Sequence, residues 1–276
     1  KYPVENPKVN VSGKWEVTFD YDKDPEKSIG LFSCDPIKGL DKEMLNNRVT
    51  GTFLTETGDY RFLEGATIND SLYLSTFDGS HAFLFKAQLK GDTLWGQFLS
   101  GNHYRSNWFA VQNDQFELGH PDSLTYVQND KQIEFSLPDL DGGTYNYPND
   151  ELKNKVHLIQ IMGTWCPNCL DESMYLKDLY AQHDGKLEIV AVTFETQKGL
   201  AAKRDKVSSY KVNLELPYQF VIGGDACKPC ATKLFPMLSD IMSFPTLIFI
   251  DKKGEIRKVH TGFNGPGTGV YYEQFV

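Results

Sequence analysis

Two pairs of cysteines share the spacing Cys-x-x-Cys, which can support three kinds of chemistry. The first pair is Cys166 and Cys169, and the second is Cys227 and Cys230. Cysteines at this spacing can exchange disulfides, form a local disulfide, or supply half of a zinc site. A zinc site built from both pairs is disfavoured, because the gap between them far exceeds the roughly 15–20 residues of compact zinc modules. We therefore expect no metal, and we expect Cys34 to be a buried free thiol.

The residues around the first pair place it where a thiol becomes reactive. The apolar run 156–162 predicts a buried strand, and 167–182 predicts a helix with one apolar face. Cys166 therefore falls just before the first turn of a helix, where unpaired N–H groups and the helix dipole stabilise a thiolate. Cys169, one turn further along, is placed to attack a mixed disulfide on Cys166. This strand–turn–helix context favours redox exchange over a structural disulfide.

The second pair, Cys227 and Cys230, precedes an expected helix over 231–241. A local disulfide that clips the start of this helix is the favoured interpretation, and a second redox pair is the alternative. We expect the two cysteines to form a disulfide that is harder to reduce than the first pair.

The pattern of apolar residues changes near residue 125, and this change predicts which strands and helices position the cysteines. Before it, short alternating stretches broken by turn formers predict an antiparallel β domain, a barrel or a sandwich, with Phe83 and Phe85 buried. After it, strands alternate with helices, which is typical of an α/β domain. The expected domains are 1–125, whose role the sequence does not indicate, and 126–276. Strands are expected over 15–19, 28–32, 49–55, 60–63, 72–77, 82–89, 93–99, 156–162, 187–194, 218–222, 246–250 and 256–261, and helices over 167–182, 198–210, 231–241 and from near 269.

The composition excludes several classes of partner. The formal charge is −9 and no basic stripe occurs, so nucleic acid and anionic lipid surfaces are poor partners. No apolar run approaches the roughly 20 residues of a membrane helix, so we expect no transmembrane segment. The sequence starts at Lys1, and we expect any export signal or lipid anchor to lie outside it.

Two short motifs carry a resemblance to a known group of proteins. Trp165-Cys166-Pro167-Asn168-Cys169 and Ser243-Phe244-Pro245-Thr246 resemble the thioredoxin-like fold, and more narrowly the TlpA/ResA group of exported bacterial thiol–disulfide oxidoreductases. The resemblance covers 132 to the end and includes the Cys-x-x-Cys-x-x-Glu run that ends at Glu172. It implies a thioredoxin-like domain over 126–276, preceded by an extra β domain.

The resemblance also implies roles for single residues. Cys166 attacks the substrate disulfide, Cys169 resolves the intermediate, and Glu172 lies beside them and assists proton movement. Without the resemblance, Glu172 reads as an ordinary solvated helix carboxylate. Glu195, just past the second strand of this domain, is a weaker candidate for the same neighbourhood. The implied substrate-binding residues are Trp165, which limits access, Phe244, and Pro245, which is expected to be cis.

The sequence thus predicts an exported disulfide reductase of the periplasm or cell envelope that needs no cofactor. Its expected partners are disulfide-containing or thiol proteins and an electron donor protein, and oxidase or isomerase activity stays open. A peroxidase is a minor alternative. In the peroxidatic turn a threonine stands three residues before the reactive cysteine, whereas Thr164 stands two residues before Cys166, which weakens this interpretation. The alternative from another class is a binding module in which the cysteine pairs are only structural.

Overall fold

The chain divides into two compact units. The first unit comprises Lys1–Leu118 with Asn264–Val276, and the second comprises Gly119–Phe263. The computed structural model describes residues 9–34, 47–78, 81–128, 132–183 and 185–276.

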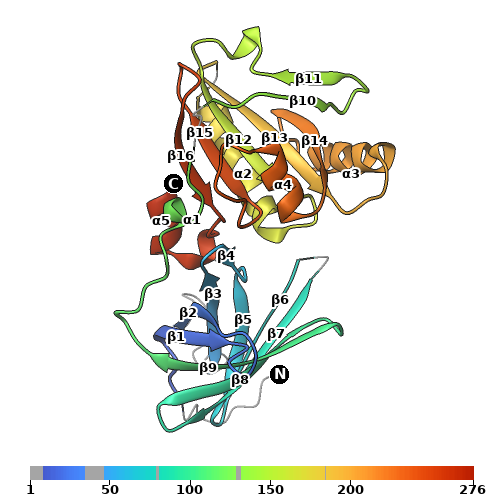
Figure 1. The fold of residues 1–276 in the computed structure, drawn as a ribbon. Coiled ribbons are helices and arrows are strands. Elements are labelled where there is room, and N and C mark those ends of the chain that lie inside the picture. Colours follow the sequence, from blue (N-terminus) through green and yellow to red (C-terminus); the bar gives the residue numbers. More distant parts are fainter. Residues whose placement is uncertain (1–8, 35–46, 79–80, 129–131, 184) are drawn as a thin grey trace. The chain divides into compact units, whose positions relative to one another are not determined.

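The first unit is a closed antiparallel β barrel (Figure 1). Its long strands each pair with the next along the chain, apart from the short strand β4, and pairing of β1 with β9 closes the ring. The strands are β1 (Gly13–Phe19), β2 (Glu26–Ser33), β3 (Arg48–Thr55), β4 (Gly58–Asp59), β5 (Leu63–Ile68), β6 (Ser71–Phe77), β7 (Ala82–Lys90), β8 (Thr93–Ser100) and β9 (Tyr104–Gln112).

Aromatic side chains fill the barrel interior, because alternate residues of each strand point inward. Phe85 stacks between Phe53 and Phe98, with ring centroids 4.4 Å apart on either side. Trp108 is fully buried in the same cluster, and Phe83 packs against it partly buried. The predicted antiparallel β architecture is therefore confirmed, and the barrel has a packed aromatic core.

Two details of the barrel differ from the expected strands. The expected strand 60–63 is wrong, because Arg61 has a positive φ of 62° and β5 starts only at Leu63. Strand β9 was not expected, although Trp108 and Ala110 alternate along it as buried residues.

The end of the chain belongs to the barrel unit, whereas the expected range 126–276 places it with the second domain. The backbone N–H of Gly265 donates to the Asp59 carboxylate at 2.6 Å, and the Tyr271 hydroxyl donates to Glu117 at 3.0 Å. The segment contains η3 (Pro266–Thr268) and α5 (Val270–Phe275). The local sequence can predict that such a short helix forms, but it does not indicate the surface on which the helix packs.

The second unit contains a five-stranded sheet in the order β14-β13-β12-β15-β16 (Figure 1). Strands β12, β13 and β14 are parallel, and β15 and β16 are antiparallel to their neighbours. The parallel strands are buried on both faces, which explains their nearly unbroken apolar sequences. The strands are β12 (Val156–Met162), β13 (Leu187–Glu195), β14 (Gln219–Asp225), β15 (Thr246–Ile250) and β16 (Ile256–Thr261).

Helices α2 (Pro167–Gln182) and α3 (Leu200–Asn213) cover one face of this sheet. Two successive right-handed crossovers in the same direction put both helices on that face, and Lys177 of α2 donates to the carbonyl of Leu214 at the end of α3. On the opposite face, Tyr147 of the hairpin β10 (Phe135–Pro138) and β11 (Thr144–Tyr147) hydrogen-bonds to His157 of β12. The sheet and helices confirm a thioredoxin-like fold for this part of the chain.

The helix expected over 231–241 is instead the shorter α4 (Lys228–Leu234). The residue before a proline disfavours helical geometry, and the proline has no N–H to donate. Phe235 accordingly caps α4 with a non-helical backbone, and Pro236 follows it. None of the helices in the described ranges is long and apolar enough to cross a membrane.

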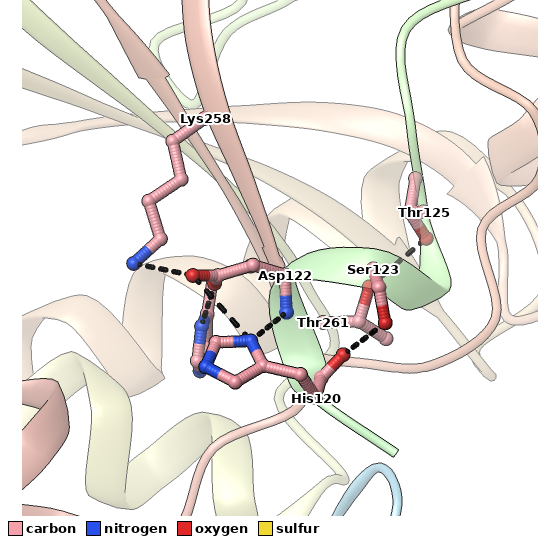
Figure 2. A network of polar contacts seen from close by, with 7 residues as sticks. His120, Asp122, Ser123, Thr125, Lys258 and Thr261 are labelled. Atoms are coloured by element: carbon pink, nitrogen blue, oxygen red, sulfur yellow. Dashed lines mark hydrogen bonds and ion pairs between the residues drawn. The ribbon is translucent and has the colours of Figure 1, made fainter.

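A polar network explains why the second unit begins at residue 119 (Figure 2). Asp122 lies in α1 (Pro121–Leu124), and its carboxylate contacts two residues of β16. It accepts a hydrogen bond from His260 at 2.6 Å and forms an ion pair with Lys258 at 2.9 Å. Burial raises the Asp122 pKa, but these two partners outweigh it and hold the pKa below its usual value. Thr261 also donates to the hydroxyl of Thr125 at 2.9 Å. Together these bonds tie α1 to the edge of the sheet.

Candidate active site

Cys166 lies at the N-terminal cap of α2, directly after the turn that follows β12. The backbone N–H of Cys169 donates to its sulfur at 3.4 Å, and the Cys166 thiol donates to the carbonyl of Phe244 at 3.4 Å. The sulfur-bearing side chain is almost completely buried, with 9% of the residue exposed. A substrate disulfide can therefore reach Cys166 only in a close, desolvated contact.

The pKa values of the two cysteines are shifted in opposite directions. Both are free thiols in the structure. The hydrogen bond from the Cys169 side chain, assisted by backbone N–H groups, lowers the Cys166 pKa in spite of burial. Complete burial, together with the neighbouring Cys166, raises the Cys169 pKa. Cys166 is thus the group that forms a thiolate first.

Gly163 allows the turn before the cysteines to close tightly. A Cβ at this position would lie 2.3 Å from the indole nitrogen of Trp165 and 2.8 Å from the carbonyl of Phe194. The Trp165 indole donates to that same carbonyl at 2.9 Å, and its ring meets Phe244 edge-on at 5.7 Å. Trp165 is 38% exposed, so it forms one wall beside Cys166.

Phe244 lies next to Cys166 in space, and Pro245 follows it in the chain. The peptide bond between them is cis. Both side chains are buried, and it is the carbonyl of Phe244 that faces the Cys166 thiol. Met242, two residues earlier, is 42% exposed and adds apolar surface at this loop.

Glu172 is completely buried on α2, one turn after Cys169, and is not a solvated helix carboxylate. Burial raises its pKa to about 8, while a hydrogen bond from Gln160 acts in the opposite direction. The Gln160 amide donates to Oε2 of the carboxyl group at 2.9 Å. A carboxyl group with this pKa can gain or lose a proton near neutral pH.

Glu195, the last residue of β13, binds the turn that precedes Cys166. One carboxylate oxygen accepts the Thr164 backbone N–H at 2.9 Å, and the other accepts the Thr164 hydroxyl at 2.6 Å. Its own backbone carbonyl accepts the N–H of Ala226, the residue before Cys227. Burial raises the Glu195 pKa. Glu195 therefore connects the loops that carry the two cysteine pairs.

Cys227 and Cys230 form a disulfide at the start of α4. Both residues are partly exposed, and the Cys230 N–H donates to the Cys227 sulfur at 3.0 Å. Cys34, in the barrel, is a free thiol that is only partly buried.

We expect the Cys227–Cys230 disulfide to be harder to reduce than Cys166–Cys169. A loop of two residues gives little chain-entropy stabilisation, so its persistence depends on local packing at the helix start. The measurement is a glutathione redox titration followed by peptide mapping. If this disulfide opens at the same or a less reducing potential than the first pair, it is a second exchange centre and not a clip.

The residues that sequence reasoning missed are the polar side chains behind the cysteines, Gln160 and Ser173. Gln160 and His157 both interrupt the apolar strand β12, and a glutamine between two isoleucines was the available signal. Its amide lies 3.2 Å from the Ser173 hydroxyl. Among the described residues, no group of three or more His, Cys, Asp or Glu side chains is placed to hold a metal ion.

Comparison with known proteins points to redox chemistry. Residues 128–273 match the family model described as Redoxin. The chain is 28% identical over 138 residues to the thioredoxin-like protein YneN of Bacillus subtilis, covering 49% of this chain and 73% of that protein. It is 29% identical over 134 residues to the thiol-disulfide oxidoreductase ResA of Halalkalibacterium halodurans, and this alignment covers 48% of this chain and 68% of that protein. A solved thiol-disulfide oxidoreductase from Bacteroides fragilis aligns with 53% of this chain and 100% of its own, at 16% identity and a TM-score of 0.40.

Proposed function

The chain belongs to the redoxin family, and from this premise we propose that it is a thiol–disulfide oxidoreductase that reduces disulfides of exported proteins. The observation that carries the proposal is the position of Cys166 at the N-cap of α2, where its sulfur accepts the backbone N–H of Cys169 one turn further along. That the chain is a thiol–disulfide oxidoreductase follows from its relatives. The direction of exchange, the substrates and the roles of single residues are proposals.

In the proposed reaction, the Cys166 thiolate attacks one sulfur of the substrate disulfide. A mixed disulfide forms and the other substrate sulfur leaves as a thiolate that takes up a proton. Cys169 then gives its proton to the Glu172 carboxylate and attacks Cys166. The products are the Cys166–Cys169 disulfide and a reduced substrate, and a donor protein with a dithiol restores the enzyme.

Substrate docking is proposed for the loop opposite Cys166. Pro245, which enters β15, donates no backbone hydrogen bond, and this leaves the backbone of Phe244 free to pair with an extended chain. The exposed surfaces of Trp165, which contacts Phe244, and of Met242, two residues before it, offer apolar contacts to a substrate. Disulfide-containing proteins in the periplasm or cell envelope are the proposed substrates, because protein disulfides persist in such compartments.

The test is the reduction potential of Cys166–Cys169, measured by equilibration with dithiothreitol or glutathione buffers and thiol alkylation. A reductase is expected to have a potential near the roughly −270 mV of thioredoxin, while a potential near about −120 mV marks a strong oxidant such as DsbA. A potential at the oxidising end would overturn the proposed direction. A Cys166 that no alkylating reagent or disulfide reaches would overturn the enzyme itself and leave a structural module.

A further inference from the structure

The carboxyl group of Glu172 has two oxygen atoms in different surroundings. Oε2 accepts the amide N–H of Gln160 at 2.9 Å. Oε1 is also buried, and among the described residues it has no hydrogen-bond partner. A buried polar atom without a partner costs free energy, so such an atom in an active site needs a reason.

We propose that Gln160 is a positioning residue for disulfide resolution, because its amide occupies Oε2 of Glu172 and leaves Oε1 as the oxygen that exchanges a proton with Cys169. A carboxyl oxygen that accepts an N–H hydrogen bond is the poorer place for a proton, because the carbonyl oxygen of a neutral acid accepts such a bond better than its hydroxyl oxygen does. The proton of the neutral acid is therefore on Oε1. The inference rests on the proposed function, in which Glu172 accepts the proton of Cys169.

Gln160 can serve this role because it is itself held in place. It lies on the central strand β12, paired with Ala191 of β13 on one side and Leu247 of β15 on the other. Its side chain is completely buried on the α2 face, and the Ser173 hydroxyl donates to its carbonyl oxygen at 3.3 Å. The amide nitrogen is thereby directed at Glu172, which neighbours Ser173 on the helix.

The proton transfer balances in the resolving step. The S–H proton of Cys169 moves to Oε1, and the electron pair left on the Cys169 sulfur forms the bond to Cys166. The bond between Cys166 and the substrate sulfur breaks, and that sulfur leaves as a thiolate. Glu172 ends as a neutral acid, which is the form that burial favours.

Few other groups near this carboxyl can titrate in the neutral range. Tyr218, which precedes β14, and Tyr210, on α3, approach the same site through Ser173. Burial raises the pKa of both tyrosines, so they keep their protons throughout this range. Within the described part of the chain, the other titratable groups that act on this site are Cys166 and Cys169, which belong to the reaction itself, and Asp171, whose negative charge raises the Cys166 pKa.

The experiment compares Gln160→Met with the unchanged protein in two measurements. The first is the pH midpoint of Glu172, read from the carboxylic C=O band in infrared difference spectra of the reduced protein. The second is the rate at which a preformed mixed disulfide on Cys166 is resolved. Loss of the amide donor is expected to raise the midpoint and to slow resolution about tenfold at neutral pH, with the rate of attack by Cys166 unchanged.

Two further variants keep the test decisive. Ser173→Ala retains the amide but frees its orientation, and a smaller shift in the same direction is expected, so this variant replaces Gln160→Met if that protein does not fold. Tyr147→Phe removes a buried hydrogen bond to His157 on the opposite face of β12 and should leave the midpoint unchanged. An unchanged midpoint in Gln160→Met, or equal slowing of attack and resolution, would overturn the inference. If the unchanged protein reduces no disulfide, the proposed function fails, while the midpoint still reports on the contact between Gln160 and Glu172.

Discussion

Cys166→Ser is expected to abolish disulfide reduction, to the level of a blank without enzyme. The lowered pKa of Cys166 lets its thiol ionise to the thiolate that attacks a disulfide. A serine hydroxyl stays protonated at neutral pH, so the variant has no such nucleophile. Turbidimetric reduction of insulin, with dithiothreitol as the reductant, measures the loss.

Cys169→Ser is expected to accumulate a mixed disulfide on Cys166, because attack proceeds and resolution does not. Mass spectrometry of the variant after incubation with substrate should show one covalent substrate chain for each protein chain. Cys34→Ser is the matched control, since Cys34 is also a free thiol but lies in the barrel, and it should retain full activity. Full turnover by Cys166→Ser, or no trapped adduct in Cys169→Ser, would contradict the attack-and-resolve mechanism.

The sequence predicted those parts of the fold that depend on local pattern. The bounds 156–162, 246–250 and 256–261 for strands and 167–182 for the active-site helix agree with β12, β15, β16 and α2. Apolar runs gave the signal for β12 and β15, and the cysteine and proline at the helix start gave it for α2. The turn formers Asp251 and Gly254 indicated the hairpin that leads into β16. The hairpin β10–β11 was missed because its strands have only four residues each.

The polar part of the site could not be predicted in the same way. The contacts of Gln160, Ser173 and Glu195 depend on which strands and helices become neighbours, and a single sequence carries no direct sign of such long-range contacts. Glu172 is an example, because its spacing of three residues from Cys169 on the helix is compatible with an exposed carboxyl group and with a buried one. Only the packing of α2 against β12 decides between the two, by removing the carboxyl group from water.

Glu172→Gln is expected to remove a pH dependence from the stability of the protein. The pKa of Glu172 is raised by burial from 4.5 to about 8. Between these two values the folded protein retains a proton that the unfolded chain has lost, so the free energy of unfolding falls as pH rises across that window. At pH 7 the cost of this group is on the order of 3 kcal/mol. Chemical denaturation of both proteins at about pH 5 and pH 8 should therefore show a flatter pH response in the variant.

The same substitution is expected to slow resolution while it preserves attack by Cys166. Glutamine can still accept the Gln160 hydrogen bond, but it cannot take the Cys169 proton, and general acid–base groups of this kind contribute roughly 10²-fold or more. Removal of the carboxyl group should also shift the thiol titration of the cysteine pair, because its charge raises the Cys169 pKa. Asp178→Asn, which neutralises an exposed carboxylate on the same helix, is the control and should change neither measurement. If Glu172→Gln leaves the stability profile, the thiol titration and the resolution rate unchanged, the buried carboxyl group has no part in the proton transfer.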